Sequence, residues 1–199
     1  ELKHRALTIF EEGLERIAPI AAFDAKDLIA LEGTTVLSKR IVGKEDIDIA
    51  ALIRRLGNSD WVRQGLGYVD DAGSQCPFCQ QEINDALKTK LNDYFDETYL
   101  ADIAAIDRTR DAYDAYSETL LARLESIHVA GSKYLDAVAF RADIDRLSAR
   151  VELNLRQLDR KRKEASSQVT LEAVGEIITS LQKAISNANA EIGKHNATV

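Results

Sequence analysis

Apolar residues recur every three or four positions along much of this chain, which is the spacing of a helix with one buried face. The pattern is most regular over residues 84–128, a stretch without proline or glycine. Residues 135–163 and 171–195 carry the same pattern, and short breaks at 129–132 and 166–170 separate the three stretches. Short connections between amphipathic helices favour antiparallel neighbours. The pattern therefore predicts long helices packed as a hairpin or bundle.

The chain before residue 84 follows a less regular pattern. An apolar stripe predicts a helix over residues 1–18, which Pro19 ends or bends. Shorter apolar runs follow, separated by several glycines, and we expect them to form a turn-rich knob packed around Trp61 and Tyr68. No stretch shows the alternation of a β-strand, so the predicted fold is all-α.

This pattern divides the chain into two predicted regions. Residues 1–83 form the short-helix knob, which ends in the Cys-Pro-Phe-Cys turn at 76–79. Residues 84–199 form a long antiparallel helical coiled-coil region. The only two cysteines of the chain thus lie at the end of the knob.

Composition narrows the class of protein. With 30% charged residues, 6% aromatic residues and two prolines in 199 residues, the chain fits an extended helical protein better than a compact one. A net charge of −7 disfavours nonspecific binding to nucleic acid or anionic membranes. No apolar run approaches the roughly 20 residues of a membrane span. Two cysteines give no disulfide framework, so we expect a cytoplasmic setting.

The sequence also lacks several features of a complete enzyme. It contains no methionine and opens with no signal peptide, so we expect it to be an internal fragment of a larger protein. It contains no P-loop, no Gly-x-Ser-x-Gly and no His-Glu-x-x-His motif. We therefore expect no catalytic residues within the fragment.

The motif that carries chemistry is the cysteine pair Cys76 and Cys79. Two thiols on one tight turn can share a zinc ion, and a Cys-Pro-x-Cys sequence favours such a turn. The same spacing serves glutaredoxin-like redox dithiols, but these need the motif between a strand and a helix. A third interpretation is a reduced pair that packs the turn as small apolar groups. The residues alone leave all three open.

A zinc interpretation needs further ligands, because structural zinc takes four. The three histidines, His4, His128 and His195, are scattered, and each fits a helix surface or helix end better than a site near the turn. Two identical turns meeting across a twofold axis would supply four thiolates. Cys76 and Cys79 are therefore the predicted metal ligands, zinc the predicted metal and a homodimer the predicted assembly.

Two further groups of residues are interpreted as structural. The basic run Arg160–Lys163 ends a predicted helix, where positive charge complements the helix dipole, so it is interpreted as a solvated cap rather than a phosphate-binding patch. The tyrosines between residues 94 and 116 lie on or beside the apolar stripe. Core packing explains them better than stacking on nucleic-acid bases.

Several short segments together resemble a known family. They are Asp-Trp-Val-Arg-Gln-Gly at 60–65, Cys-Pro-Phe-Cys-Gln-Gln at 76–81, Leu-Asn-Asp-Tyr-Phe at 91–95 with Tyr99, and the pairs Glu-Ile at 191–192 and His-Asn at 195–196. Over most of residues 58–199 the chain is similar to the helical insert of bacterial AAA-type, SMC-like ATPases that include the PrrC and RloC anticodon nucleases. One departure is Gln80, which stands where that family has glycine after the second cysteine.

The resemblance implies a non-catalytic arm inserted in a P-loop ATPase, between its Walker A and Walker B halves. It implies a homodimer clasped by zinc at paired Cys-x-x-Cys turns, as in zinc-hook repair ATPases. The ATPase head of the same polypeptide is then a partner, with ATP bound there and not in this fragment. Nucleic acid is expected as a partner of the parent protein only, and no membrane is expected. The alternatives are a stand-alone coiled-coil interaction module and a thiol-redox switch.

Overall fold

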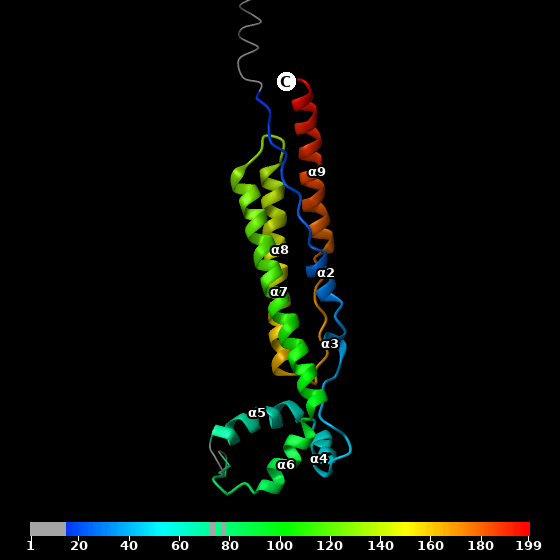
Figure 1. Ribbon diagram of the computed structural model, residues 1–199, viewed down its shortest axis with the longest axis vertical. Coiled ribbons are helices and arrows are strands. Elements are labelled where there is room, and N and C mark those ends of the chain that lie inside the picture. Colours follow the sequence, from blue (N-terminus) through cyan, green and yellow to red (C-terminus); the bar gives the residue numbers. More distant parts are fainter. Residues whose placement is uncertain (1–14, 72–74, 77–78) are drawn as a thin grey trace, which may run out of the picture. The chain divides into compact units, whose positions relative to one another are not determined.

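The structure is a computed structural model that describes residues 15–71, 75–76 and 79–199. Its helices (Figure 1) are α2 Lys26–Glu32, α3 Thr35–Ser38, α4 Asp48–Leu56, α5 Ser59–Asp71, α6 Asp85–Tyr94, α7 Glu97–Ala130, α8 Ala137–Lys163 and α9 Gly175–Ala197. The described residues form no β-strand, only an isolated antiparallel bridge between Gln75 and Glu82. The predicted all-α fold is confirmed. None of the described helices combines the length and apolar character that crossing a membrane requires.

Contacts between residues divide the chain into two compact units. Unit 1 contains the chain up to Lys26 together with Ser117–Val151 and Ala173–Val199, and unit 2 contains Asp27–Tyr116 and Glu152–Glu172. The long helices α7 and α8 each contribute residues to both units. The predicted boundary at residue 83 rests on the sequence pattern alone and stays a prediction.

Within unit 2, helices α7 and α8 run antiparallel. Arg110 Nε lies 3.2 Å from Asp159 Oδ1, and one turn further along α7 Tyr113 contacts Asn154, which lies earlier on α8. Asn154 Nδ2 donates to the Tyr113 hydroxyl at 2.7 Å, and both side chains are fully buried. Polar contacts of this kind fix the register of the two helices in addition to their apolar stripes.

Side-chain caps determine where the helices begin. Asn84 Oδ1 accepts the Leu87 N–H at 2.8 Å at the start of α6, and Asp96 Oδ1 accepts the Tyr99 N–H at 3.0 Å at the start of α7. The prediction of one uninterrupted helix is wrong at Phe95 and Asp96, because Asp96 caps a new helix instead of continuing the old one. Sequence periodicity does not report this break, since the apolar spacing continues through it.

Residues 15–25 are extended, although the apolar stripe predicts a helix that reaches residue 18. The prediction is wrong for residues 15–18, and residues 1–14 lie outside the described part of the chain. The extended form persists because main-chain groups of Ile17 and Ile20 bond to side chains of α9 and not to one another. Pro19 adds to this effect because it disfavours a helical conformation at the residue before it.

A non-helical connector, residues 164–174, joins α8 to α9. The last helix begins at Gly175 and not at the predicted Leu171. The buried side chain of Asn154 holds the connector in its extended form. Its Oδ1 accepts the Glu172 N–H at 2.7 Å, and its Nδ2 donates to the Glu172 carbonyl at 2.8 Å. These bonds take up the main-chain groups that a helix would use internally.

The buried ammonium group of Lys161 ties the connector to a distant segment. It donates to the main-chain carbonyls of Lys39 at 2.5 Å, Ala165 at 2.8 Å and Ser167 at 2.5 Å. We call this group of contacts the lysine pin. Lys161 is fully buried, so the interpretation of Arg160–Lys163 as a solvated cap is wrong for this residue. An ammonium group has three donors, and the pin uses all of them.

Candidate metal site at the cysteine hairpin

The two cysteines lie on a short hairpin of unit 2, between α5 and α6. We call residues 75–82 the cysteine hairpin; Pro77 and Phe78 within it lie outside the described residues. The Cys76 N–H donates to the Gln81 carbonyl at 2.8 Å, next to the bridge that pairs Gln75 with Glu82. The Gln80 N–H donates to the Cys76 carbonyl, also at 2.8 Å. The main chain itself therefore closes the turn that carries both thiols.

Gln80 adopts a left-handed main-chain conformation, with φ of 58°. It is the only non-glycine residue with positive φ in the described part of the chain. Glycine takes this conformation without the steric cost that a Cβ imposes. The family that this chain resembles has glycine at this position, which suits the left-handed conformation of the turn. Here a glutamine adopts that conformation.

The thiols differ in exposure and are not joined to each other. Cys79 is exposed and Cys76 is half-buried, and the two form no disulfide. The hairpin lies between two helices, whereas a glutaredoxin-like dithiol needs a preceding strand in a sheet, which the described residues do not provide. This setting favours metal binding or a simple reduced pair over redox chemistry.

The predicted zinc ligands are only half of a structural site. Within the described residues, no group of three or more histidine, cysteine, aspartate or glutamate side chains could hold a metal ion. His128 and His195 lie in the last turns of α7 and α9, as expected for helix-end residues, and both belong to unit 1. His4 lies outside the described residues. The hairpin of one chain therefore offers zinc two thiolates, and the other two ligands must come from elsewhere.

Helix α5, which leads into the hairpin, carries aromatic residues that the sequence placed in the core of the knob. Trp61 is 57% exposed and Tyr68 is 61% exposed, so that prediction is wrong. Ala50, Ile53 and Tyr94 are buried instead. The periodic pattern could not distinguish these alternatives, because α5 is short and interrupted by glycines.

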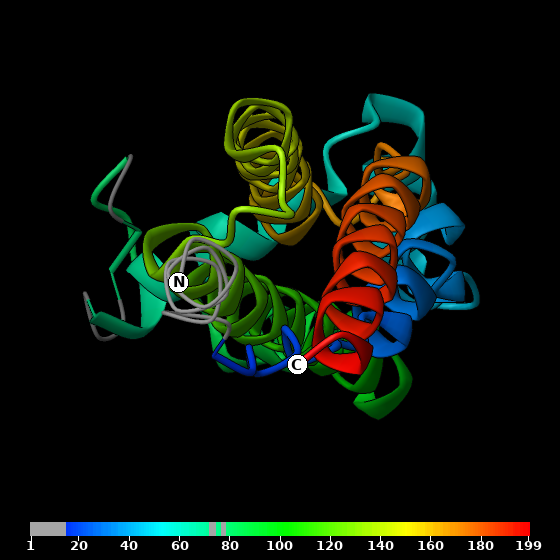
Figure 2. The ribbon, with the colours of Figure 1, turned by 90° about the horizontal axis from the view of Figure 1, so that it is seen from above.

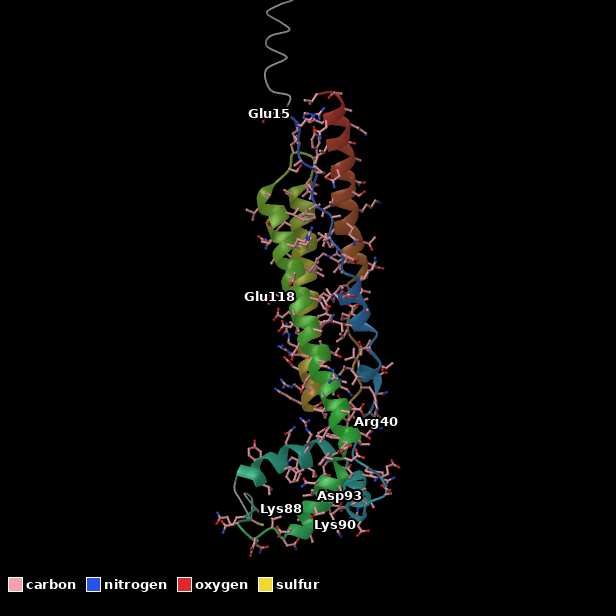
Figure 3. All side chains as sticks on the ribbon, viewed as in Figure 1. Glu15, Arg40, Lys88, Lys90, Asp93 and Glu118 are labelled. Atoms are coloured by element: carbon pink, nitrogen blue, oxygen red, sulfur yellow. The ribbon has the colours of Figure 1, made fainter. Side chains whose placement is uncertain are left out.

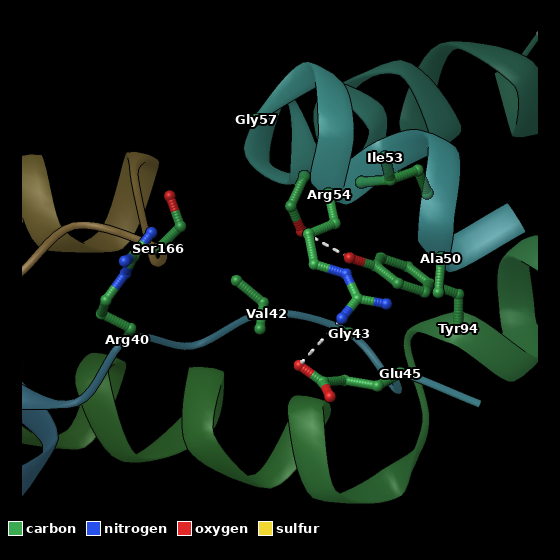
Figure 4. A pocket seen from close by; sticks show the side chains of 11 residues that line it. Arg40, Val42, Gly43, Glu45, Ala50, Ile53, Arg54, Gly57, Tyr94 and Ser166 are labelled. Carbon is green, nitrogen blue, oxygen red and sulfur yellow. Dashed lines mark hydrogen bonds and ion pairs between the residues drawn. The ribbon is translucent and has the colours of Figure 1, made fainter. Parts of the chain in front are cut away.

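Unit 2 also contains a pocket of about 100 Å³, lined by residues 40–45, α4, the start of α5, the end of α6 and Ser166 of the connector (Figure 4). The Tyr94 hydroxyl donates to Ser59 Oγ at 3.4 Å, and Arg54 Nη1 lies 3.8 Å from Glu45 Oε1. Gly43 packs against the Tyr94 ring so closely that any side chain there would collide with it. Glu45 is the only acid of the lining and faces Arg54, so the Ser59 hydroxyl has no base beside it in this pocket.

Comparison with known proteins gives one match. A family model described as AAA domain matches residues 1–199, which covers both units and the cysteine hairpin. No curated protein matches the chain, and no solved structure matches it.

Proposed function

The chain belongs to the AAA domain family and is a region of an AAA-type ATPase, and on this premise we propose that it is a non-catalytic helical arm of that ATPase. In this proposal the arm is inserted in the P-loop head of the same polypeptide, which binds ATP in the cytoplasm. The parent is of the anticodon-nuclease or DNA-repair type. The arm carries information about bound nucleotide, or about a bound partner, along α7 and α8.

The observation that supports a specific role is the half-site at Cys76 and Cys79. A closed zinc site needs four ligands, and the described residues of one chain contain no group of three or more side chains that could hold a metal ion. Two hairpins related by a twofold axis supply four thiolates without any further residue. We therefore propose that two copies of the arm dimerise through zinc at their cysteine hairpins.

The residues of the hairpin suit this role in a specific way. Bound zinc would supply a redox-inert crosslink between the two chains. The exposed side chain of Cys79 is accessible to a second copy. The bond from the Gln80 N–H to the Cys76 carbonyl holds the turn before metal arrives, so less conformational freedom is lost on binding.

Metal analysis combined with a mass measurement tests the clasp. We expect purified chain to contain one zinc ion per two chains and to sediment as a dimer. A chelator, or the double substitution Cys76→Ser and Cys79→Ser, removes the metal and leaves a monomer with an unchanged helical circular dichroism spectrum. A wild-type chain that is monomeric and free of metal after reconstitution with zinc contradicts the clasp.

The position of the arm in the parent is tested separately by the full-length gene. We expect a Walker A segment upstream of this sequence and a Walker B segment downstream of it. Flanking sequence without either segment would contradict the insertion and favour a stand-alone interaction module, whatever the metal content of the chain.

A further inference from the structure

An extended segment of unit 1 runs beside helix α9 (Figure 2); we call it the strap and define it as residues 15–23. Helix α9 contacts it through a row of amide side chains. The amides belong to Gln182, Asn189 and Asn196. They are seven residues apart, close to two helical turns, and therefore lie on one face of α9. Glu15, at the beginning of the strap, lies near the end of α9 that carries Asn196 (Figure 3).

Each of the two asparagines bonds to both the N–H and the C=O group of one strap residue. Asn196 Oδ1 accepts the Ile17 N–H at 2.9 Å, and its Nδ2 donates to the Ile17 carbonyl at 2.8 Å. Asn189 makes the same pair of bonds with Ile20, both at 2.8 Å. Gln182 Nε2 adds a longer bond of 3.4 Å to the Phe23 carbonyl. Each asparagine side chain thus makes the pair of main-chain hydrogen bonds that a neighbouring β-strand would make.

The spacing of the two partners matches. Seven helical residues at 1.5 Å each span about 10.5 Å, and three extended residues at about 3.4 Å each span about 10 Å. Residues 17, 20 and 23 of the strap consequently meet residues 196, 189 and 182 of α9 in antiparallel order. An extended chain of any sequence keeps this match, because only main-chain geometry enters it.

Before Phe23, side-chain packing contributes little to this contact. Of strap residues 15–22, only Ile17 and Ile20 are partly buried, whereas Phe23, at the end of the strap, is buried. A hollow of about 310 Å³ lies between the strap and α9, lined by Ala22, Phe23, Gln182 and Ile185 among others. The Ala22 carbonyl is held by Arg123 Nη2 at 2.6 Å, again through the main chain. Residues 15–22 of the strap are therefore held mainly through their main chain, and the side chain of Phe23 anchors the end of the strap.

The same kind of contact, an asparagine side chain bonded to the N–H and C=O groups of one residue, also occurs in unit 2 and is therefore not peculiar to the strap. There Asn154 binds both main-chain groups of Glu172 at 2.7 and 2.8 Å. That asparagine is fully buried. In unit 1 the corresponding asparagines, Asn189 and Asn196, are partly exposed, and their bonds to Ile17 and Ile20 are partly buried.

We propose that this face of α9 is a binding surface for an extended polypeptide main chain, and that the strap is its resident and exchangeable ligand. A segment fits when it presents N–H and C=O groups at two positions three residues apart, with no proline at either. Pro19 satisfies this rule because it falls between the two positions. The strap occupies the surface because its tether keeps it at high effective concentration. The proposal does not depend on the zinc clasp or on the ATPase head.

A peptide titration of the full chain tests this proposal. The substitutions Ile17→Pro and Ile20→Pro remove the two strap N–H groups that bond to α9, so we expect added peptide to displace the weakened strap. A synthetic peptide of residues 15–25 is then added, and the side-chain amide signals of Asn189 and Asn196 are followed by NMR. We expect saturable shifts with this peptide, and equal shifts when its residues 16, 18 and 21 are changed to serine. Wild-type chain, whose surface is filled, shows no shift.

The decisive control is a peptide N-methylated at Ile17 and Ile20, which keeps every side chain and loses both donors. We expect it to cause no shift, and shifts equal to those of the parent peptide would overturn the proposal. If the proline variant does not fold, hydrogen exchange is measured in Asn189→Leu/Asn196→Leu. The Ile17 and Ile20 amides should exchange roughly tenfold faster, given the lost hydrogen bonds, while the exposed control Asn187→Leu leaves them unchanged. Unchanged exchange in the double variant would equally overturn it.

Discussion

The cysteine hairpin and the connector at 164–174 are both non-helical links between helices, but side chains contribute to the hydrogen bonds of the second and not to the main-chain bonds that close the first. In the hairpin, main-chain groups a few positions apart bond to one another, as Cys76 does with Gln81. In the connector, side chains from outside it bind the main chain, in addition to main-chain bonds such as the one from the Val169 N–H to the Leu37 carbonyl. The Ser166 N–H donates to Asp60 Oδ1 at 3.3 Å, and Asn154 and Lys161 hold other connector residues.

Because of this difference, the hairpin can change its conformation at a small cost in free energy, and the connector cannot. Opening the hairpin breaks only local bonds and exposes groups that are already near water, so the cost is small. Opening the connector leaves buried donors and acceptors without partners, which costs much more. A ligand site benefits from the first kind of link, whereas the length and register of long helices depend on the second.

The largest expected effect comes from removing the lysine pin. Lys161→Met removes one donor from each of three main-chain carbonyls, of which that of Ala165 keeps the Ile41 N–H. We expect the free energy of unfolding to fall by about 3 kcal/mol in urea titrations. Burial lowers the pKa of Lys161, so desolvation offsets part of what the pin contributes. Lys163→Met, at an exposed position of the same basic run, is the matched control. Equal losses in both variants would contradict the pin.

A somewhat smaller loss is expected for Asn154→Leu. This change removes both bonds to Glu172 and the bond to Tyr113, and leaves buried groups unpaired, at about 2 kcal/mol. Thermal unfolding followed by circular dichroism measures the loss. Asn187→Leu, on an exposed face of α9, should shift the midpoint little. A wild-type midpoint for Asn154→Leu would show that the connector does not depend on this residue.

Stability should also fall at high pH, because two buried tyrosines favour the protonated phenol. Burial raises the pKa of Tyr113 to about 12 and that of Tyr99 to about 12. Their contribution is present below the unfolded-state pKa of about 10 and is lost as pH rises from about 10 to 12. We expect an effect on the order of 2 kcal/mol per tyrosine. Tyr113→Phe should flatten the decline, whereas the exposed control Tyr68→Phe should not.

The smallest effect, and the only gain, is expected at the hairpin. Gln80→Gly relieves the left-handed conformation and should stabilise the turn by up to about 1 kcal/mol. A competition titration with a zinc chelator measures the effect, and we expect the variant to bind zinc more tightly than the wild-type chain. Gln81→Gly, at the adjacent position without positive φ, should weaken the turn instead. Tighter binding in both variants would contradict the conformational explanation.

The sequence predicts the features that depend on local pattern. The apolar period predicts α7 to α9, and the Cys-x-x-Cys spacing predicts a tight turn at Cys76 and Cys79. Each of these follows from a few neighbouring residues.

Features that depend on distant partners are missed. Leu147, Val151, Asn154, Leu158 and Lys161 recur at alternating spacings of four and three, so the register of α8 places both polar residues on its buried stripe. That signal is present in the sequence. The partners of Lys161, up to 122 residues away, cannot be derived from it, because carbonyl groups are the same at every position.

The strap has a consequence for the order in which the chain acquires its structure. Ile17 in the strap cannot form its hydrogen bonds to Asn196 until Asn196 has been synthesised, 179 residues later. At translation rates of about 5 to 20 residues per second, the wait is on the order of ten to forty seconds. During that time the strap has main-chain groups that only water or another polypeptide can satisfy. A ribosome-bound chain is therefore a state in which the strap is open to a chaperone or to a neighbouring nascent chain.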